Sequence, residues 1–227
     1  FSLGMVELVS YWKIACPERV EIKCGFLNDR QKEFWKQLYF GGLSEFFYIN
    51  GIETDKDSFM TIECDEAEDN IAPICYKTAG INLIPVGGGK DSAVTAELLK
   101  PFGKRNKFFT VNDQAARTET VIAAGYGEDD IIKTYRTIDK NLLELNKKGF
   151  LNGHTPFSAI VAFLSLYCAY LIGGEYIVLS NESSANSGNI EGREVNHQYS
   201  KSYRFENDFI EYVGENLLSG IRYFSLL

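Results

Sequence analysis

The stretch Ile84–Val94 reads IPVGGGKDSAV, and it decides the fold class of this chain. Strand-forming residues lead into three consecutive glycines, and Lys90-Asp91-Ser92 then open a segment typical of a helix. Glycines let the main chain adopt positive φ and approach a ligand closely. The N–H groups at a helix N-terminus attract anions. This order of strand, loop and helix predicts an anion site at the carboxyl end of a parallel strand.

Strands and helices alternate from Gly80 onward, which predicts a parallel sheet with helices on both faces. The expected strands are residues 81–86, 107–111, 131–135 and 176–180, and the expected helices are residues 92–99, 113–124, 139–148 and 155–171. The last of these helices is apolar nearly all round, so we expect it to be buried. The fold class is therefore α/β.

Residues 1–78 predict a small α+β domain ahead of the α/β domain of residues 79–227. Asn28 and Gln31 have the spacing of a capping box. The helix they open should stop at Gly41-Gly42, since glycine commonly ends a helix. Strands are expected at residues 20–24, 46–49 and 59–64.

Composition narrows the class of partner. The net charge is −8 with scattered Lys and Arg, so a nucleic-acid partner is not expected. A small anion needs only a few local cations and N–H groups. The longest apolar run, residues 157–172, is shorter than the ~20 residues of a membrane span, so no membrane partner is expected. Five cysteines without a C-x-x-C pair predict reduced, mostly buried thiols in a cytoplasmic protein.

The glycine loop matches neither the Walker pattern nor the dinucleotide fingerprint. It resembles the S-G-G-x-D-S loop of the PP-loop ATP pyrophosphatases, which are adenine nucleotide alpha hydrolase-like proteins. They cleave ATP to AMP and pyrophosphate. Gly87 stands where that motif has Ser. The site residues are Gly87, Gly88, Gly89 and Ser92 for pyrophosphate, Lys90 as a point charge on the phosphates, and Asp91 for magnesium or as a helix cap. A glycine-rich turn without a ligand is the alternative.

Two polar segments further along the chain lie directly beside a predicted helix or strand. His154 lies in NGHTPFSA (152–159), just before the predicted helix cap, where it could orient a nucleotide or exchange a proton. A histidine that merely supports the cap is the alternative. Glu182 is the single acid of SNESSANSGN (180–189), directly after the fourth strand, and could bind magnesium or act as a base. The alternative is a solvated loop.

A third segment, EVNHQYSKSYRFE (194–206), gathers basic side chains. On a helix, His197 and Lys201 would share a face, with Arg204 one turn beyond Lys201. Such a cluster can hold a carboxylate or phosphate. An ordinary solvated basic face is the alternative.

Six stretches together resemble the family of ATP-dependent UDP-N-acetylmuramoyl-L-alanyl-L-glutamate epimerases, from Leu3 to about Glu206. They are LGMVELVSYWK, GGLSEFFYINGI, VGGGKDS, NGHTPFSA, SNESSANSGN and VNHQYSKS. The resemblance implies that ATP with Mg²⁺ adenylates the terminal L-glutamate carboxylate of UDP-N-acetylmuramoyl-L-Ala-L-Glu. Inversion of its α-carbon then gives D-glutamate for peptidoglycan synthesis. Family chains continue past the point where this one stops, so we expect a part of a longer protein.

Within that resemblance, His197 and Lys201 are candidates for the proton-transfer pair or a carboxylate clamp, with His154 in reserve. Asp91 and Glu182 are the candidate magnesium ligands. Two other functions stay open: a PP-loop amidotransferase or thiolase with another substrate, and an ATP-binding module without turnover. The sequence makes no prediction of the oligomeric state.

Overall fold

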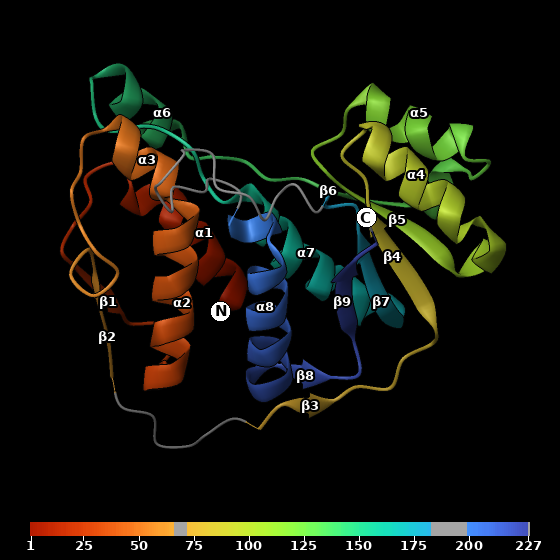
Figure 1. The fold of residues 1–227 in the computed structure, drawn as a ribbon, viewed down its shortest axis with the longest axis horizontal. Helices are drawn as coiled ribbons and strands as arrows, with labels where there is room; N and C mark the ends of the chain where they lie inside the picture. Colours follow the sequence, from red (N-terminus) through yellow and green to blue (C-terminus); the bar gives the residue numbers. More distant parts are fainter. Residues whose placement is uncertain (66–71, 183–198, 227) are drawn as a thin grey trace. The chain divides into compact units, whose positions relative to one another are not determined.

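The computed structural model describes residues 1–65, 72–182 and 199–226 (Figure 1). The helices are α1 Ser2–Trp12, α2 Asp29–Gly42, α3 Ser44–Ile49, α4 Lys90–Leu99, η1 Lys100–Arg105, α5 Ala115–Ala123, η2 Glu128–Asp130, α6 Lys140–Lys147, α7 Phe157–Ile172, η4 Tyr199–Lys201 and α8 Tyr203–Asn216. The strands are β1 Arg19–Ile22, β2 Thr61–Cys64, β3 Ile74–Cys75, β4 Ile81–Pro85, β5 Asn106–Val111, β6 Ile131–Thr134, β7 Gly174–Leu179, β8 Leu218–Ser219 and β9 Arg222–Ser225.

These elements form two compact units, each built from three chain segments. The sheet unit comprises Pro73–Thr137, Val161–Ser184 and Val213–Leu227, and the aromatic unit comprises Phe1–Ala72, Ile138–Ile160 and Ala185–Tyr212. Segments on both sides of residue 78 therefore contribute to the aromatic unit. The boundary between domains at residues 78 and 79 stays a prediction.

The sheet unit is organised around parallel strands in the order β6-β5-β4-β7-β9. Numbered along the chain, this order is 3-2-1-4-5, so the strand order reverses between β4 and β7. Ligands of open α/β sheets bind outside the carboxyl ends of the strands at this switch point. The α/β class expected from the sequence is confirmed, and so are the four predicted strands of this sheet.

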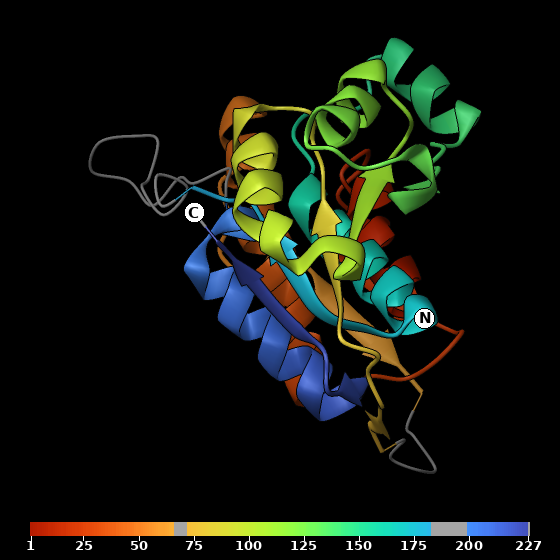
Figure 2. The same ribbon diagram turned by 90° about the vertical axis from the view of Figure 1, so that its right-hand side faces the viewer.

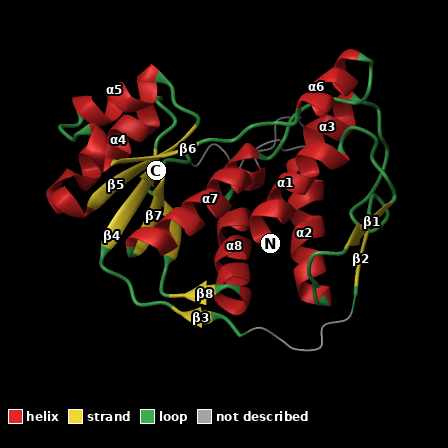
Figure 3. Ribbon diagram, turned by 180° about the vertical axis from the view of Figure 1, so that it is seen from behind, coloured by secondary structure: helices red, strands yellow, loops and turns green. Residues whose placement is uncertain are grey.

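Both faces of the central strands are buried, as parallel sheets require. Ile84, Phe108 and Val178 pack on one face with residues of α4 and α5, including Ala96 and Val121. Figure 2 shows these two helices on the same side of the sheet. The neighbouring strand residues Leu83, Phe109 and Ile177 point the other way and are also buried. Residues 161–172 of α7 run along that face (Figure 3). The sheet thus holds the ends of β4 and β7 rigidly.

The aromatic unit has large rings at its centre. Trp35 and Tyr39 of α2 are fully buried, and Trp35 donates a 3.2 Å hydrogen bond to the Tyr212 hydroxyl. Tyr39 in turn donates to the Met5 carbonyl at 2.6 Å. Beside this core, β1 and β2 pair in parallel. The predicted capping box is confirmed, because Asn28 and Gln31 exchange side chain-to-backbone hydrogen bonds of 2.9 and 2.8 Å.

One prediction of an element in the aromatic unit is wrong. Residues 46–49 form part of helix α3, because the aromatic run is short enough to fit either period and Phe46 and Phe47 pack inward as a helical pair. Helix α2 ends at Gly42, so its predicted stop at Gly41-Gly42 is confirmed. There the missing side chains admit close neighbours: a Cβ at Gly42 would lie 2.5 Å from the Pro156 side chain.

Two predictions about burial also need correction. Helix α7 buries Phe163 and Ala169 but exposes Tyr167 and Leu171, so it is not covered all round. All five cysteines are unpaired, as expected, yet Cys168 alone among them is buried. In the part of the chain that the structure describes, no helix combines the length and apolarity of a membrane span.

Candidate functional site

The glycine loop connects β4 to α4 at the switch point of the sheet. Gly88 has φ of +84°, and a Cβ there would lie 3.2–3.3 Å from atoms of Ala116 and Arg117 at the start of α5. Position 88 therefore requires glycine for its conformation and its neighbours. Gly89 is the N-cap of α4 with extended backbone, and a Cβ there would meet nothing within 4 Å. The loop is thus closely packed at Gly88 and open at Gly89.

Ser92 forms a side-chain hydrogen bond to the backbone of the glycine loop. Its Oγ accepts a 3.0 Å hydrogen bond from the Gly87 N–H, and the residue is buried. The hydroxyl predicted to face a phosphate is therefore engaged with the loop backbone. The N–H groups at the start of α4 have no partner inside the helix, and they give the loop its attraction for anions.

One ion pair joins this loop to the end of β7. Lys90 Nζ lies 3.1 Å from Glu182 Oε1 and 4.0 Å from Asp91 Oδ1. The hydrogen bond to Glu182, with the charges of both carboxylates, raises the pKa of Lys90 above its ordinary value. Lys90 thus stays cationic at neutral pH, although its side chain is 83% exposed. The structure brings together the predicted residues Lys90, Asp91 and Glu182.

Ser180 is a residue of this edge that we did not single out from the sequence. Ser180 directly follows Leu179, the last residue of β7, which is the neighbour of β4 in the sheet. The Ser180 Oγ is buried and has no hydrogen-bond partner among the described residues. A hydroxyl in this state can bond to a ligand oxygen. Its position as the last residue of the predicted strand 176–180, at the sheet edge expected to carry the glycine loop, was the signal available in the sequence.

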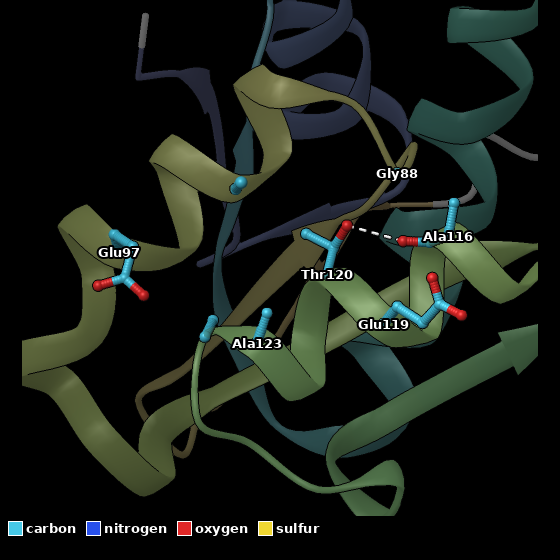
Figure 4. Close-up of a pocket in the computed structure, with 8 residues that line it drawn as sticks. Gly88, Glu97, Ala116, Glu119, Thr120 and Ala123 are labelled. Atoms are coloured by element: carbon cyan, nitrogen blue, oxygen red, sulfur yellow. Dashed lines mark hydrogen bonds between the residues drawn. The ribbon is translucent and has the colours of Figure 1, made fainter.

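A groove of about 390 Å³ lies between α4 and α5, with Gly88 at its lining (Figure 4). The lining residues are Gly88, Ala93, Glu97, Ala116, Glu119, Thr120, Ala123 and Ala124. Thr120 turns its hydroxyl back onto the Ala116 carbonyl at 2.7 Å. Glu97 and Glu119 make the groove unfavourable for a phosphate, because like charges repel. The groove is therefore less suited to an anion than the loop side, where Lys90 lies.

The carboxylates of this edge suit a magnesium ion that arrives with a substrate phosphate. Across residues 1–65, 72–182 and 199–226, no three His, Cys, Asp or Glu residues gather as a metal-binding group. Asp91 and Glu182 are two carboxylates that share contact with Lys90. Magnesium commonly takes one or two carboxylates and completes its shell with water and phosphate oxygens. The residues present fit that pattern.

The aromatic unit holds the segment around His154. A Cβ at Gly42 of α2 would lie 2.5 Å from Pro156, and one at Gly41 would lie 2.8 Å from the Tyr199 ring. Both glycines thus admit close contacts on the same turn of α2. They bring the 152–159 segment and η4, which carries the candidate Lys201, to one helix. His154 is half-buried and Lys201 is exposed.

The third polar segment is not one continuous helix over its described part. Lys201 ends η4, and α8 begins at Tyr203. Ser202 separates them by accepting from the Phe205 N–H at 3.2 Å, which is the role of a helix cap. Lys201 and Arg204 thus lie on different elements, contrary to the helix assumed from the sequence. Arg204 faces Asp208 at 3.9 Å. His197 lies outside the described residues.

A parallel sheet whose strand order reverses between β4 and β7 defines the class of doubly wound α/β proteins. Within that class, the family model described as the MurL N-terminal domain matches residues 1–226. The chain belongs to this family.

Relatives in three bacteria carry the same name, UDP-N-acetyl-alpha-D-muramoyl-L-alanyl-L-glutamate epimerase. The protein of Xanthomonas oryzae pv. oryzae is 31% identical over 227 residues, which cover 99% of this chain and 49% of that protein. The proteins of Salinispora tropica and a Micromonospora species are each 31% identical over 229 residues, covering 99% of this chain and 48% and 49% of theirs. The chain spans about half the length of these curated relatives.

A solved structure described as a ketoreductase domain from the bacillaene assembly line aligns with 98% of this chain and 70% of its own. The TM-score is 0.37 and the sequence identity is 13%. A likeness this distant carries no argument about fold or function.

Proposed function

We propose that this chain is the nucleotide-binding part of an ATP-dependent epimerase. The substrate is UDP-N-acetylmuramoyl-L-Ala-L-Glu, and the product carries D-glutamate at its terminus. The family membership and the name shared by the three relatives support this substrate. The reaction serves peptidoglycan synthesis in the cytoplasm, where ATP and nucleotide-linked precursors are available.

The observation that carries the proposal is the ion pair between Lys90 and Glu182 beside the glycine loop. It places a cation and a carboxylate at the switch point of the sheet, next to the N-terminus of α4. The loop backbone and Lys90 bind the ATP phosphates, as in the PP-loop ATP pyrophosphatases that the loop resembles. Asp91 and Glu182 would hold a magnesium ion, which would supply positive charge beside the phosphates.

Activation of the carboxylate explains why an epimerase would use ATP. A carboxylate resists loss of its α-proton, because the enolate would carry a second negative charge. The terminal carboxylate attacks the α-phosphorus of ATP and displaces pyrophosphate, which gives an acyl-adenylate without charge at the carbonyl. A base then removes the α-proton from one face and an acid returns a proton to the other. Water finally cleaves the acyl-adenylate and releases AMP.

His154, His197 and Lys201 are the residues we propose for proton transfer or for holding the substrate carboxylate. His154 is half-buried just before α7, and an imidazole side chain can act as a general acid or base. Lys201 is exposed on η4 and can contact a carboxylate.

The test is release of AMP and pyrophosphate from ATP–Mg²⁺, with and without UDP-N-acetylmuramoyl-L-Ala-L-Glu. It uses the full-length protein and residues 1–227, and the reaction in D₂O reports exchange at the α-carbon. Release that depends on the dipeptidyl substrate, together with deuterium in a D-glutamate product, is the expected result for full length. Gly88→Ala should abolish it, whereas Gly214→Ala should leave it intact.

Other results would select the rival functions. AMP release without α-carbon exchange would point to another PP-loop enzyme, such as an amidotransferase, which then needs an ammonia source. ATP binding without AMP release from full length would leave a binding module and refute the epimerase proposal. Release by full length but not by residues 1–227 would place essential residues in the other half of the protein.

A further inference from the structure

Lys13 is a buried lysine that the proposed chemistry does not yet use. It follows α1, and only 7% of its surface is exposed. Lysine is almost never this deeply buried unless its ammonium group is paired. Its Nζ donates to the Gly153 carbonyl at 2.5 Å and to the Thr155 hydroxyl at 2.7 Å. These two acceptors are the immediate neighbours of His154 in the chain.

Other contacts fix the same turn within the aromatic unit. The Leu151 N–H donates to the Ile14 carbonyl at 3.2 Å, and Asn50 Nδ2 donates to the Asn152 carbonyl at 3.1 Å. Gly153 has φ of +154°, and a Cβ there would lie 3.0 Å from the Phe46 ring. The turn is thus held from α1 and α3, and Lys13 is the contact that holds it on both sides of the histidine.

The two contacts give Lys13 a specific relation to His154. Burial of an ammonium group costs free energy, and the Gly153 carbonyl and the Thr155 hydroxyl each return part of that cost as a hydrogen bond. An apolar side chain of similar length, such as methionine, would fill the space without that cost. The ammonium group makes hydrogen bonds to the residues immediately before and after His154. These bonds fix the backbone of the turn and thereby the direction in which the His154 imidazole projects.

We propose that Lys13 is the positioning residue for His154. It acts through the turn of residues 153–155 and does not itself touch the reacting atoms. The expected loss of activity on changing Lys13 rests on the proposed epimerase function. The expected change in the orientation of the His154 imidazole does not depend on that function.

The chain makes the positional effect measurable, because it contains only two histidines. In the His197→Gln background, the imidazole resonances of ¹³C-labelled histidine report His154 alone. Lys13→Met should shift and broaden these resonances, and Thr155→Val, which removes one acceptor, should produce a smaller change in the same direction. Lys23→Met is the matched control, since Lys23 belongs to the same unit and its side chain is 76% exposed. It should leave the resonances unchanged.

Kinetics of the full-length protein test the catalytic consequence. For Lys13→Met we expect kcat to fall at least about tenfold, since a small misplacement of a reacting group has effects of this size. The KM for ATP should change less than about twofold, because the glycine loop is untouched. The melting temperature should move by less than about 5 °C, the shift of a minor change in stability.

Resonances of His154 that stay at their wild-type positions in both Lys13→Met and Thr155→Val would overturn the proposal. If Lys13→Met does not fold, Thr155→Val decides alone. An unchanged kcat with shifted resonances would refute the catalytic part. A wild-type protein without epimerase activity would refute the proposed function and leave the positional result to stand by itself.

Discussion

Lys90 Nζ and Glu182 Oε1, 3.1 Å apart, join the residues that follow the carboxyl ends of β4 and β7. The two residues are 92 positions apart in the chain but adjacent at the switch point, since β4 and β7 are neighbouring strands. A phosphate arriving at the glycine loop would compete with Glu182 for the ammonium group. A magnesium ion would then draw the carboxylate to itself. The pair is thus suited to open when a metal–nucleotide complex binds.

Replacement of Lys90 should affect ligand binding and leave folding intact. The side chain is 83% exposed, and an exposed ion pair contributes little to stability. Lys90→Met should therefore keep the melting temperature but weaken ATP–Mg²⁺ binding about tenfold, the effect of losing one charge-assisted hydrogen bond. Isothermal titration calorimetry measures the affinity. Lys23→Met is the control, and equal affinities of the two variants would contradict the role of Lys90.

Gly88→Ala should destabilise the sheet unit by about 1–3 kcal/mol, because alanine is strained at positive φ and its Cβ would meet Ala116 and Arg117. Gly214→Ala is the matched control. Gly214 lies inside α8 with open space around it, so alanine should stabilise that helix by about 0.5–1 kcal/mol. Urea unfolding of both variants measures the difference. A Gly88→Ala protein as stable as wild type would show that the loop can relax.

Gly42→Ala should destabilise the aromatic unit by about 1–3 kcal/mol through overpacking. The added Cβ would lie 2.5 Å from Pro156, whose ring cannot move far. Gly4→Ala is the control in α1, where nothing lies within 4 Å of the added carbon. The same histidine resonances that report on Lys13 should also shift in Gly42→Ala, since Pro156 is two residues from His154. Equal unfolding midpoints for the two variants would argue against close packing at Gly42.

The sequence predicted the elements whose local pattern and tertiary environment agree. The glycine loop, its flanking strand and the alternation after Gly80 led to the parallel sheet, because buried strands and amphipathic helices differ clearly in period. Strand β9 is only four residues long, and β8 only two, so neither has a period to read. Residues 46–49 were mistaken for a strand for a related reason, since a six-residue helix spans fewer than two turns.

The candidate site residues that come soon after predicted strands could be placed from the sequence. Lys90, Asp91 and Glu182 could be expected to meet, because the carboxyl ends of adjacent parallel strands share one edge. Lys13 could not be found this way. Its partners lie 140 and 142 positions away, and a lysine at the end of an amphipathic helix ordinarily reads as solvated. The local rule for helix ends correctly predicted the stop at Gly41-Gly42, whereas the close packing of these two glycines is visible only in the tertiary structure.

A buried polar network at the amino ends of β4 and β5 should be important for stability. Asn106 is fully buried; its Nδ2 donates to Leu99 O at 2.6 Å and to the Tyr126 hydroxyl at 2.8 Å, and its Oδ1 accepts from Asn82 at 2.8 Å. Asn106→Ala should cost about 2–4 kcal/mol, because several buried partners lose their bonds. Tyr126→Phe removes one bond and should cost about 1 kcal/mol. Chemical unfolding that ranks the variants in the reverse order would contradict this assignment.

Asp130 should make stability depend on pH in the acid range. Lys107 Nζ donates to Asp130 Oδ1 at 2.6 Å, and this hydrogen bond, with one from the Gly127 N–H, lowers the pKa of Asp130. A carboxyl whose pKa is lower in the folded state stabilises the fold above its unfolded pKa of about 3.9. That stabilisation is lost as the pH falls through the folded pKa. Asp130→Asn should thus be less stable than wild type at pH 7, by about 0.5–1 kcal/mol for a partly exposed pair.

The difference between Asp130→Asn and wild type should shrink steadily as the pH is lowered from 5 to about 2, because the wild-type carboxylate becomes protonated and loses its advantage. Urea midpoints across this range measure the change. Asp129→Asn is the matched control, since Asp129 is the exposed neighbour on η2. A stability gap for Asp130→Asn that stays constant with pH would mean that hydrogen-bond geometry, and not the charge of the carboxylate, provides the stabilisation.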